Sequence, residues 1–266
     1  MSVFLKWVGG KRCLISQYEP LLPRRYRDYY EPFLGAGSLF FQLSPRRAYL
    51  SDRNTRLVDT FRAVRQDAEG VITRLQRYKE AHSKELYYLL RDRLNAASDW
   101  LLDRAALFIY LNATGYNGLY RENQRGHYNV PFGRSSFPAG KEDSIRQASV
   151  ALQRARLASV DFRPALHGAG EGDLVFLDPP YHPLDGKDSF SAYQGAGFSE
   201  EDHEDLASLV EDLHARGCFV MLSNSCSSRT REQYYRWRFS LMWRGGSLNS
   251  NTADRGKVRE ALITNY

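Results

Sequence analysis

Apolar residues occur in short uninterrupted runs near both ends of the chain and with helical spacing in its middle. The run 174–177 has four consecutive apolar residues between Gly172-Asp173 and two prolines. Because the prolines cannot continue a sheet ladder, this run predicts a buried central parallel strand. Further strands are predicted at 29–33, 48–51, 159–162, 218–222, 239–243 and 261–264.

The hydrophobic period changes between the second and third predicted strands. Leu57, Val58 and Phe61 mark one apolar helical face, and similar faces follow near 86–90 and 101–109. We therefore expect residues 56–143 to form an inserted, mainly helical subdomain. Residues 1–55 and 144–266 would form one α/β domain, with helices at 145–157 and from Ser199 to Gly217.

The central strand brings polar and aromatic groups to the edge of the sheet. Asp178 offers a carboxylate, Pro179 a carbonyl that precedes Pro180, and Tyr181 an aromatic face. Two acceptors can take both hydrogens of an exocyclic amine while its ring stacks on the phenol. These four residues form a candidate catalytic site, and a strand-ending turn capped by Asp178 is the structural alternative.

A glycine turn follows the first predicted strand. Gly35 and Gly37 come after Phe33 and before an apolar helix start, where a ligand could contact backbone N–H groups. Asp52 ends the second strand, where a carboxylate can accept both hydroxyls of a ribose. A plain strand-to-helix turn and a helix cap at Asp52 or Asn54 are the alternatives. At the end of the third predicted strand, Asp161 and Phe162 could line an adenine pocket, or Phe162 could be core.

The N-terminal Gly9-Gly10-Lys11 is not a phosphate loop. Leu5 and Arg12 stand where such a loop needs glycine and Ser or Thr. The glycine pair between Trp7 and Lys11 still allows close approach of a charged, partly aromatic ligand.

The segment 112–134 alternates aromatic residues with amides and arginines around an Asn-Gly turn. Aromatic groups can wedge or stack, amides and arginines can read base edges, and basic groups can hold phosphates. An irregular hairpin with inward-packed tyrosines would have the same pattern.

The segment 182–198, rich in Gly, Ser and Asp, is a candidate lid beside the catalytic strand.

Composition favours a polyanionic partner, because the formal net charge is +6. A basic surface that binds no ligand is the alternative. Three dispersed cysteines indicate neither a disulfide framework nor a zinc site, and point to a reducing compartment. No leader and no membrane-length apolar run is apparent, so we expect a cytoplasmic, nucleoid-associated protein that is monomeric in solution.

Five motifs in this order resemble the Dam family of DNA adenine-N6 methyltransferases, which belongs to the D12 class. They are Phe-Leu-Lys-Trp-Val-Gly-Gly-Lys at 4–11, Glu-Pro-Phe-Leu-Gly-Ala-Gly-Ser at 31–38, Gly-Tyr-Asn-Gly-Leu at 115–119, Asn-Val-Pro-Phe-Gly-Arg at 129–134 and Asp-Pro-Pro-Tyr at 178–181. The resemblance implies a Rossmann-like seven-stranded methyltransferase sheet with an inserted target-recognition subdomain. It also implies S-adenosylmethionine as donor, S-adenosylhomocysteine as product, no metal, and double-stranded DNA containing GATC as substrate.

The resemblance also implies roles for individual residues. The donor site would contain Trp7, Lys11, Phe33, Gly35, Gly37, Asp52, Asp161, Phe162 and Asp178. The DNA-binding residues would be Lys6, Tyr116, Asn117, Leu119, Arg121, Pro131 and Arg134, with Arg121 reading guanine and Leu119 and Pro131 contacting a thymine methyl.

The sequence departs from the family pattern at Ser135, where an aromatic is usual, and at Tyr120 and Glu122 beside Arg121. These changes bear on GATC preference more than on methylation. Rival interpretations are a methyltransferase for cytosine N4 or for adenine in RNA, and a DNA-binding protein that keeps the fold without catalysis.

Overall fold

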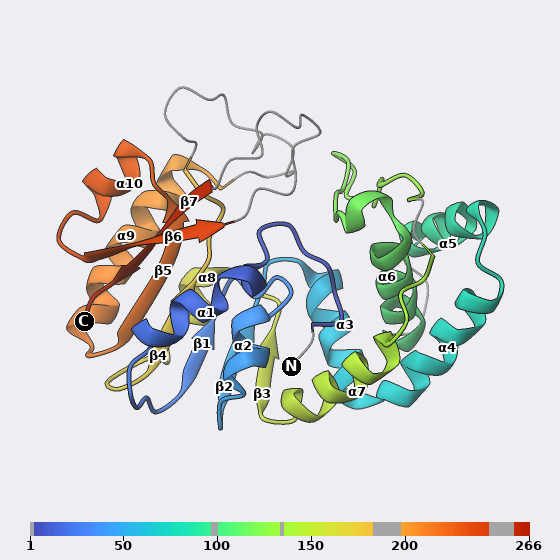
Figure 1. Ribbon diagram of the computed structural model, residues 1–266, viewed down its shortest axis with the longest axis horizontal. Coiled ribbons are helices and arrows are strands. Elements are labelled where there is room, and N and C mark those ends of the chain that lie inside the picture. Colours follow the sequence, from blue (N-terminus) through green and yellow to red (C-terminus); the bar gives the residue numbers. More distant parts are fainter. Residues whose placement is uncertain (1–2, 97–100, 134–135, 183–197, 245–257) are drawn as a thin grey trace.

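The computed structural model describes residues 3–96, 101–133, 136–182, 198–244 and 258–266. Within these ranges seven strands form one sheet in the order β3-β2-β1-β4-β5-β7-β6 (Figure 1). The strands are β1 Tyr29–Glu31, β2 Ala48–Ser51, β3 Ala155–Ala158, β4 Leu174–Leu177, β5 Phe219–Ser225, β6 Arg238–Arg244 and β7 Val258–Thr264.

The sheet is parallel from β3 to β5, and β7 runs antiparallel between β5 and β6. The chain passes from β1 outward to β2 and β3 and then returns to β4, which pairs with the other side of β1. The carboxyl ends of β1 and β4 therefore lie at a topological switch point, where open α/β sheets bind ligands. The expected α/β, Rossmann-like sheet is confirmed.

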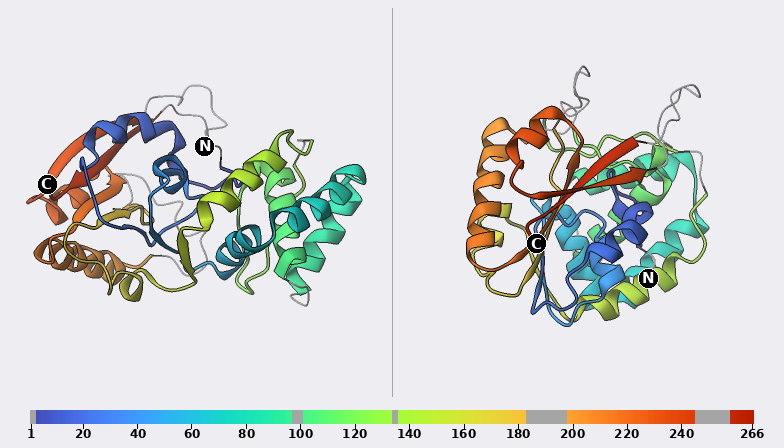
Figure 2. Two further views of the ribbon diagram at one scale, coloured as in Figure 1. Left: turned by 90° about the horizontal axis from the view of Figure 1, so that it is seen from below. Right: turned by 60° about the vertical axis from the view of Figure 1, so that its left-hand side comes forward.

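Helices cover both faces of the sheet and form a second mass beside β3. The right-hand view of Figure 2 shows α9 and α10 on one face and the N-terminal helices on the other, and Figure 1 shows α4, α5 and α6 far from β6. The helices are α1 Ile15–Tyr18, α2 Ser38–Leu43, α3 Thr55–Gln66, α4 Ala68–Glu80, α5 Lys84–Ala96, α6 Leu101–Thr114, α7 Lys141–Leu152, α8 Phe162–Ala165, α9 Glu200–Ala215 and α10 Ser228–Gln233, with 3₁₀ turns η1 Lys11–Leu14, η2 Glu19–Leu21 and η3 Tyr116–Gly118.

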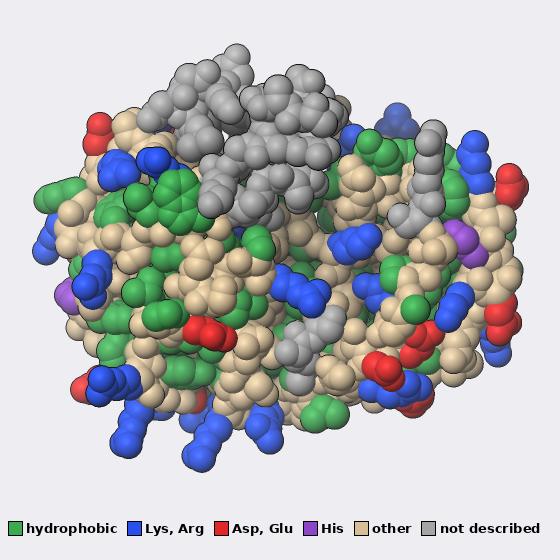
Figure 3. Space-filling view, viewed as in Figure 1, with side chains coloured by type: hydrophobic (Ala, Val, Ile, Leu, Met, Phe, Trp, Pro, Cys, Tyr) green, Lys and Arg blue, Asp and Glu red, His purple; other side chains and the backbone are tan. Residues whose placement is uncertain are grey.

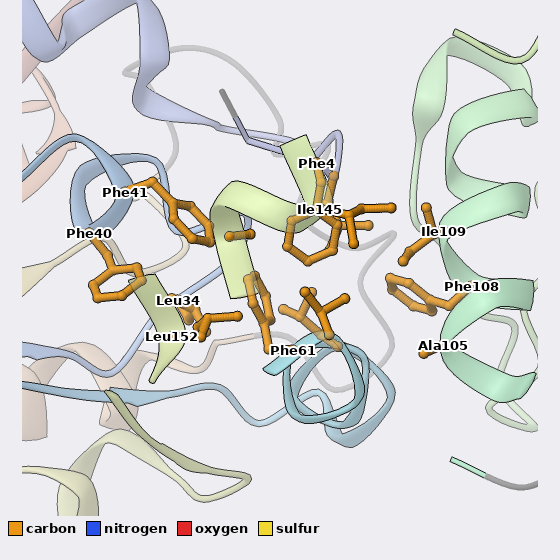
Figure 4. Close-up of a cluster of buried hydrophobic side chains, with 14 of the residues drawn as sticks. Phe4, Leu34, Phe40, Phe41, Phe61, Ala105, Phe108, Ile109, Ile145 and Leu152 are labelled. Atoms are coloured by element: carbon orange, nitrogen blue, oxygen red, sulfur yellow. The ribbon is translucent and has the colours of Figure 1, made fainter. Parts of the chain in front are cut away.

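Side chains alternate between two hydrophobic clusters. In β4, Leu174 and Phe176 belong to one cluster and Val175 and Leu177 to the other, as the twofold period of a strand requires. The first cluster continues without a break into the inserted helices. Figure 4 shows Phe4 and Phe61 between Phe40 and Phe41 of α2 and Phe108 of α6. The helices between β2 and β3 are thus packed onto the sheet through a shared core.

The structure corrects the third predicted strand. β3 is Ala155–Ala158 and pairs with β2, whereas Asp161 caps α8 and Phe162 is its first residue, only 1% exposed. The sequence signal was misleading because β3 is an edge strand whose solvent-facing Arg156 interrupts the apolar run. The preceding helix correspondingly ends at Leu152 rather than near 157, and β1 ends at Glu31 because Pro32 has no N–H.

No helix in the described part of the chain is long and apolar enough to cross a membrane. Residues 183–197 of the predicted lid lie outside the described residues.

Candidate active site

A lysine and a carboxylate meet at the switch point. Asp178 follows β4 directly, and Lys11 enters from the start of η1, with 2.8 Å between Lys11 Nζ and Asp178 Oδ1. The lysine side chain is 4% exposed and that of Asp178 is 19% exposed. Lys11 Nζ also donates to the Gly9 carbonyl at 2.6 Å. The N-terminal glycine turn thereby positions the cation that faces the candidate catalytic carboxylate.

Opposing effects act on the Asp178 carboxyl. Burial raises its pKa above the ordinary value, the Lys11 ammonium lowers it, and the nearby Glu260 raises it again. Lys11 is therefore the main group that favours the ionised form. An ionised Asp178 offers a hydrogen-bond acceptor whose remaining exposed surface faces the site.

Tyr181 is anchored through its hydroxyl. This hydroxyl donates to Glu260 Oε2 at 2.8 Å and lies 2.5 Å from Ser223 Oγ, which is itself 3.2 Å from the Tyr18 hydroxyl. Lys11 Nζ lies 4.9 Å from the centre of the Tyr181 ring. Burial and the charge of Asp178 hold the pKa of Tyr181 well above 10. The side chain therefore remains a neutral phenol with an oriented ring.

The glycine turn after β1 is braced by Asp52. Gly35 has φ +48°, and its N–H donates to Asp52 Oδ2 at 3.0 Å while the Asn54 N–H donates to Oδ1 at 2.9 Å. A Cβ on Gly35 would lie 2.8 Å from Cδ1 of Trp7, so this close approach requires glycine. Asn54, not Asp52, caps α3. Burial raises the pKa of Asp52.

Aromatic rings form a wall near this turn. Phe33 stacks on Phe162 with 5.4 Å between ring centres and meets Phe198 edge-on at 5.9 Å. Asp161 is half-buried and forms an ion pair with Arg163 at 3.0 Å. The carboxylates, aromatic wall and glycine backbone suit a ligand with a planar ring, hydroxyl groups and positive charge.

A family model described as the D12 class N6 adenine-specific DNA methyltransferase matches residues 7–245. The chain belongs to this family. It is 36% identical to the type II methyltransferase M1.LlaDCHI of Lactococcus lactis subsp. cremoris, over 99% of this chain and 95% of that protein. It is also 35% identical to the DNA adenine methylase of Escherichia coli K12 and 36% identical to that of Salmonella typhi, each over 97% of this chain and 93% of the relative.

The chain is therefore an enzyme of the DNA adenine methyltransferase class, and the family implies S-adenosylmethionine as methyl donor. The site fits such a donor: Asp178 can hold a cationic group, Asp52 can accept ribose hydroxyls, and Gly35 lets the Trp7 indole pack closely against the turn beside them. The described residues contain no group of three or more His, Cys, Asp or Glu side chains placed to hold a metal.

A buried asparagine joins the N-terminal segment to the aromatic loop after α6. Asn112 is 1% exposed, its Oδ1 accepts from the Lys6 N–H, and its Nδ2 donates to the carbonyls of Lys6 and Gly118, all within 3.2 Å. A Cβ on Gly118 would lie 2.3 Å from Cδ of Lys6. The exposed Lys6 side chain therefore crosses this loop at a fixed position.

The segment 115–133 forms an irregular hairpin with both inward and outward side chains. Bridges join Gly115 to Phe132 and Glu122 to Tyr128. Tyr128 is buried, in agreement with the hairpin alternative, but Tyr116 is 53% exposed and Asn117 has φ +53° at the tip of η3. The hairpin thus exposes polar and aromatic groups to solvent, while the buried Tyr128 stabilises its conformation.

Three further predicted DNA-binding residues, Arg121, Leu119 and Pro131, lie on the same hairpin. Arg121 is half-buried, and its Nε donates to Asn129 Oδ1 at 2.7 Å, which orients the guanidinium. Leu119 is half-buried and Pro131 is exposed. Arg134 and Ser135 lie outside the described residues.

Several buried groups behind the site were not predicted from the sequence. Three polar side chains are almost fully buried there: Glu260 is 4% exposed, Ser223 0% and Asn112 1%. Glu260 and Ser223 form hydrogen bonds with Tyr181, and Asn112 forms one with Lys6. Only Glu260 had a visible signal, a charged residue beside the apolar strand run 261–263. The other two are short polar residues in apolar surroundings, and their partners are distant in sequence.

Proposed function

We propose that the protein is a site-specific DNA adenine-N6 methyltransferase that acts on a flipped adenine in duplex DNA, with GATC as the preferred site. The observation that carries this proposal is the placement of Asp178 beside Lys11 and the anchored Tyr181 ring at the switch point. An adenine within a duplex cannot enter a pocket at the edge of a sheet, so the base has to leave the stack.

The side chains of this chain would orient the base and stabilise developing charge. The Asp178 carboxylate and the Pro179 carbonyl accept the two hydrogens of N6, while the rigid Pro180 turn directs Tyr181 to stack on the ring. These hydrogen bonds favour a pyramidal nitrogen and stabilise positive charge on it as it is methylated directly, before its proton leaves to solvent. When bound, S-adenosylmethionine supplies the methyl group from its sulfonium. In this proposal its adenosine lies among Trp7, Phe33, Gly35, Gly37, Asp52, Asp161 and Phe162.

Residues 56–143 are proposed as the target-recognition domain, inserted into the catalytic domain formed by 1–55 and 144–266. Arg121 reads a guanine, Leu119 and Pro131 contact a thymine methyl, and Tyr116 and Asn117 enter the space left by the flipped base. Lys6 and Arg134 contact neighbouring DNA. The exposure of Tyr116 and the bond from Arg121 to Asn129 support these roles.

The decisive experiment measures transfer of labelled methyl groups from S-adenosylmethionine to two matched duplexes, one with a single GATC and one with that site scrambled. We expect incorporation only into the first, and N6-methyladenine as the sole modified nucleoside on hydrolysis. Equal incorporation into both duplexes would contradict GATC specificity. N4-methylcytosine, or preferential labelling of RNA, would contradict the proposed substrate.

Asp178→Ala is expected to abolish this transfer because it removes the acceptor for N6, with circular dichroism unchanged. Asp143→Ala, which removes a 76% exposed carboxylate on α7, serves as the matched control and should retain full activity. Appreciable turnover by Asp178→Ala would overturn the assignment.

A further inference from the structure

We infer that Glu260 is a positioning residue for methyl transfer: its buried carboxylate holds the Tyr181 ring, through the tyrosine hydroxyl, in the orientation that stacks on the target base. This inference rests on the proposed function, in which Tyr181 contacts the flipped adenine. Glu260 lies on β7, which pairs with β5 on the far side from β4 (Figure 1). It therefore reaches the site from an element that none of the five sequence motifs includes.

Burial of Glu260 within a strand demands an explanation. The side chain is 4% exposed, and its strand neighbours Ala261, Leu262 and Ile263 are all buried apolar residues. A buried carboxylate is costly unless hydrogen bonds and opposite charge compensate it. Here the Tyr181 hydroxyl donates to Oε2 at 2.8 Å and Lys11 Nζ lies 3.9 Å from the same oxygen. Two of the groups that compensate the Glu260 charge, Tyr181 and Lys11, thus belong to the candidate active site.

The carboxylate imposes a direction on the hydrogen bonds behind Tyr181. An ionised carboxylate only accepts, and a phenol has one proton, so the Tyr181 proton points to Glu260. Ser223 then donates to the Tyr181 oxygen across 2.5 Å, and the Tyr18 hydroxyl donates to Ser223 across 3.2 Å. Two bonds of opposite direction thus meet at one phenol oxygen and hold the hydroxyl end of the ring in place, and because phenol hydrogen bonds prefer the ring plane they also favour one ring orientation.

Lys11 couples this arrangement to Asp178. Its ammonium lies 2.8 Å from Asp178, 3.9 Å from Glu260 and 4.9 Å from the centre of the Tyr181 ring. Two carboxylates thus share one cation, and the charge on Glu260 helps to determine where that cation lies. A purely structural role for Glu260 in β7 would not connect its charge to the geometry of the stacking ring.

The test uses the full-length enzyme and a GATC duplex with 2-aminopurine at the target adenine, whose fluorescence rises when the base leaves the stack. Single-turnover methylation of unmodified duplex, KM for S-adenosylmethionine and this fluorescence are measured for Glu260→Gln, Tyr181→Phe and the double variant. Each single change should lower the methylation rate roughly 10- to 100-fold, as a small misplacement of reacting groups does. KM should change by less than about threefold because the ground-state donor contacts remain.

The double variant should be no slower than the slower single variant, because Glu260→Gln removes the charge that receives the Tyr181 proton and Tyr181→Phe removes that proton, so both changes act on one interaction. The 2-aminopurine signal of both single variants should change in the same direction. Glu204→Gln, an exposed Glu-to-Gln control on α9, should match the wild type in all three measurements. If Glu260→Gln does not fold, Ser223→Ala takes its place, since it removes the other bond to the same phenol oxygen.

A wild-type methylation rate for Glu260→Gln would overturn the inference. So would a double variant whose rate falls by the product of the two single losses, or a variant whose KM rises while its methylation rate is unchanged. These outcomes are distinct from failure of the proposed function. That failure would appear in the wild-type enzyme, as absent adenine methylation, or in an active Asp178→Ala variant.

Discussion

At the scale of single residues, Glu31 is a buried carboxyl group beside the candidate site. It ends β1, is 3% exposed, and accepts a hydrogen bond from the Tyr29 hydroxyl at 3.0 Å. Burial raises its pKa from 4.5 to about 8, the hydrogen bond from Tyr29 opposes this, and the charge of Asp178 adds to it. At neutral pH the protein therefore holds this carboxyl mainly in its protonated form.

This raised pKa predicts a pH-dependent stability. Between pH 4.5 and about 8 the folded state binds one more proton at Glu31 than the unfolded state, so the free energy of unfolding falls as pH rises. The slope from this group is at most about 1.4 kcal/mol per pH unit. Glu31→Gln lacks the titration, and its stability relative to wild type should rise across this window. Urea unfolding at pH 5, 6.5 and 8 measures the free energy of unfolding of both proteins. If that free energy depends on pH in the same way for Glu31→Gln and the wild type, the pKa shift is contradicted. The control Glu204→Gln should show the same pH dependence as the wild type.

Much of the fold at the level of elements follows from local signals. Ser199 caps α9 as expected, and the capping box is complete: Ser199 Oγ accepts from the Asp202 N–H and Asp202 Oδ2 accepts from the Ser199 N–H. The central strand β4 coincides with the predicted apolar run. The edge strand β3 was misplaced because its position depends on pairing with β2, and an edge strand needs no continuous apolar run.

Ser199→Ala tests the contribution of the cap. It should lower the free energy of unfolding by about 1 kcal/mol, because the Asp202 N–H loses its acceptor. Chemical denaturation measures the change. Ser149→Ala, within α7, is the matched control and should be neutral or slightly stabilising because alanine is the better helix former. Equal effects of the two substitutions would show that the capping box contributes nothing specific.

At the scale of the whole molecule, a basic surface and a shaped hairpin are expected to divide the work of DNA binding. The net charge is +6, and Figure 3 shows Lys and Arg side chains in the middle of the displayed face, between the sheet and the inserted helices. Such charge supplies affinity for any duplex, whereas oriented groups that reach base edges supply specificity. The Arg121 guanidinium, held by Asn129, is the clearest oriented group.

Arg121→Ala should therefore reduce discrimination between GATC and scrambled duplexes by about 1–3 kcal/mol, with a smaller effect on nonspecific binding. Competition binding at fixed ionic strength measures both quantities. Arg125→Ala, at the exposed tip of the same hairpin, is the matched control and should weaken both duplexes alike. Equal losses on the two duplexes for Arg121→Ala would contradict base reading by this side chain.

The sequence by itself determined the elements that depend on local chemistry. The apolar run before Asp178, the glycine turn at 35–37, the cap at Ser199 and the helical period of the insertion each act within a few residues, so their patterns predict structure directly. The glycine turn and Asp178 also belong to the five motifs that carried the resemblance to the family, and the family match confirms that resemblance.

Only the tertiary structure decided which distant groups meet. Lys11 reaches Asp178 across the switch point, Asn112 joins Lys6 to Gly118, and Glu260 bonds to Tyr181 from the antiparallel strand β7. The physical reason is that a buried polar side chain must find its partner wherever the sheet order and shared core bring one, and neither is encoded in local periodicity. The candidate site residues could therefore be proposed from the chain, but the buried groups that hold them in place could not.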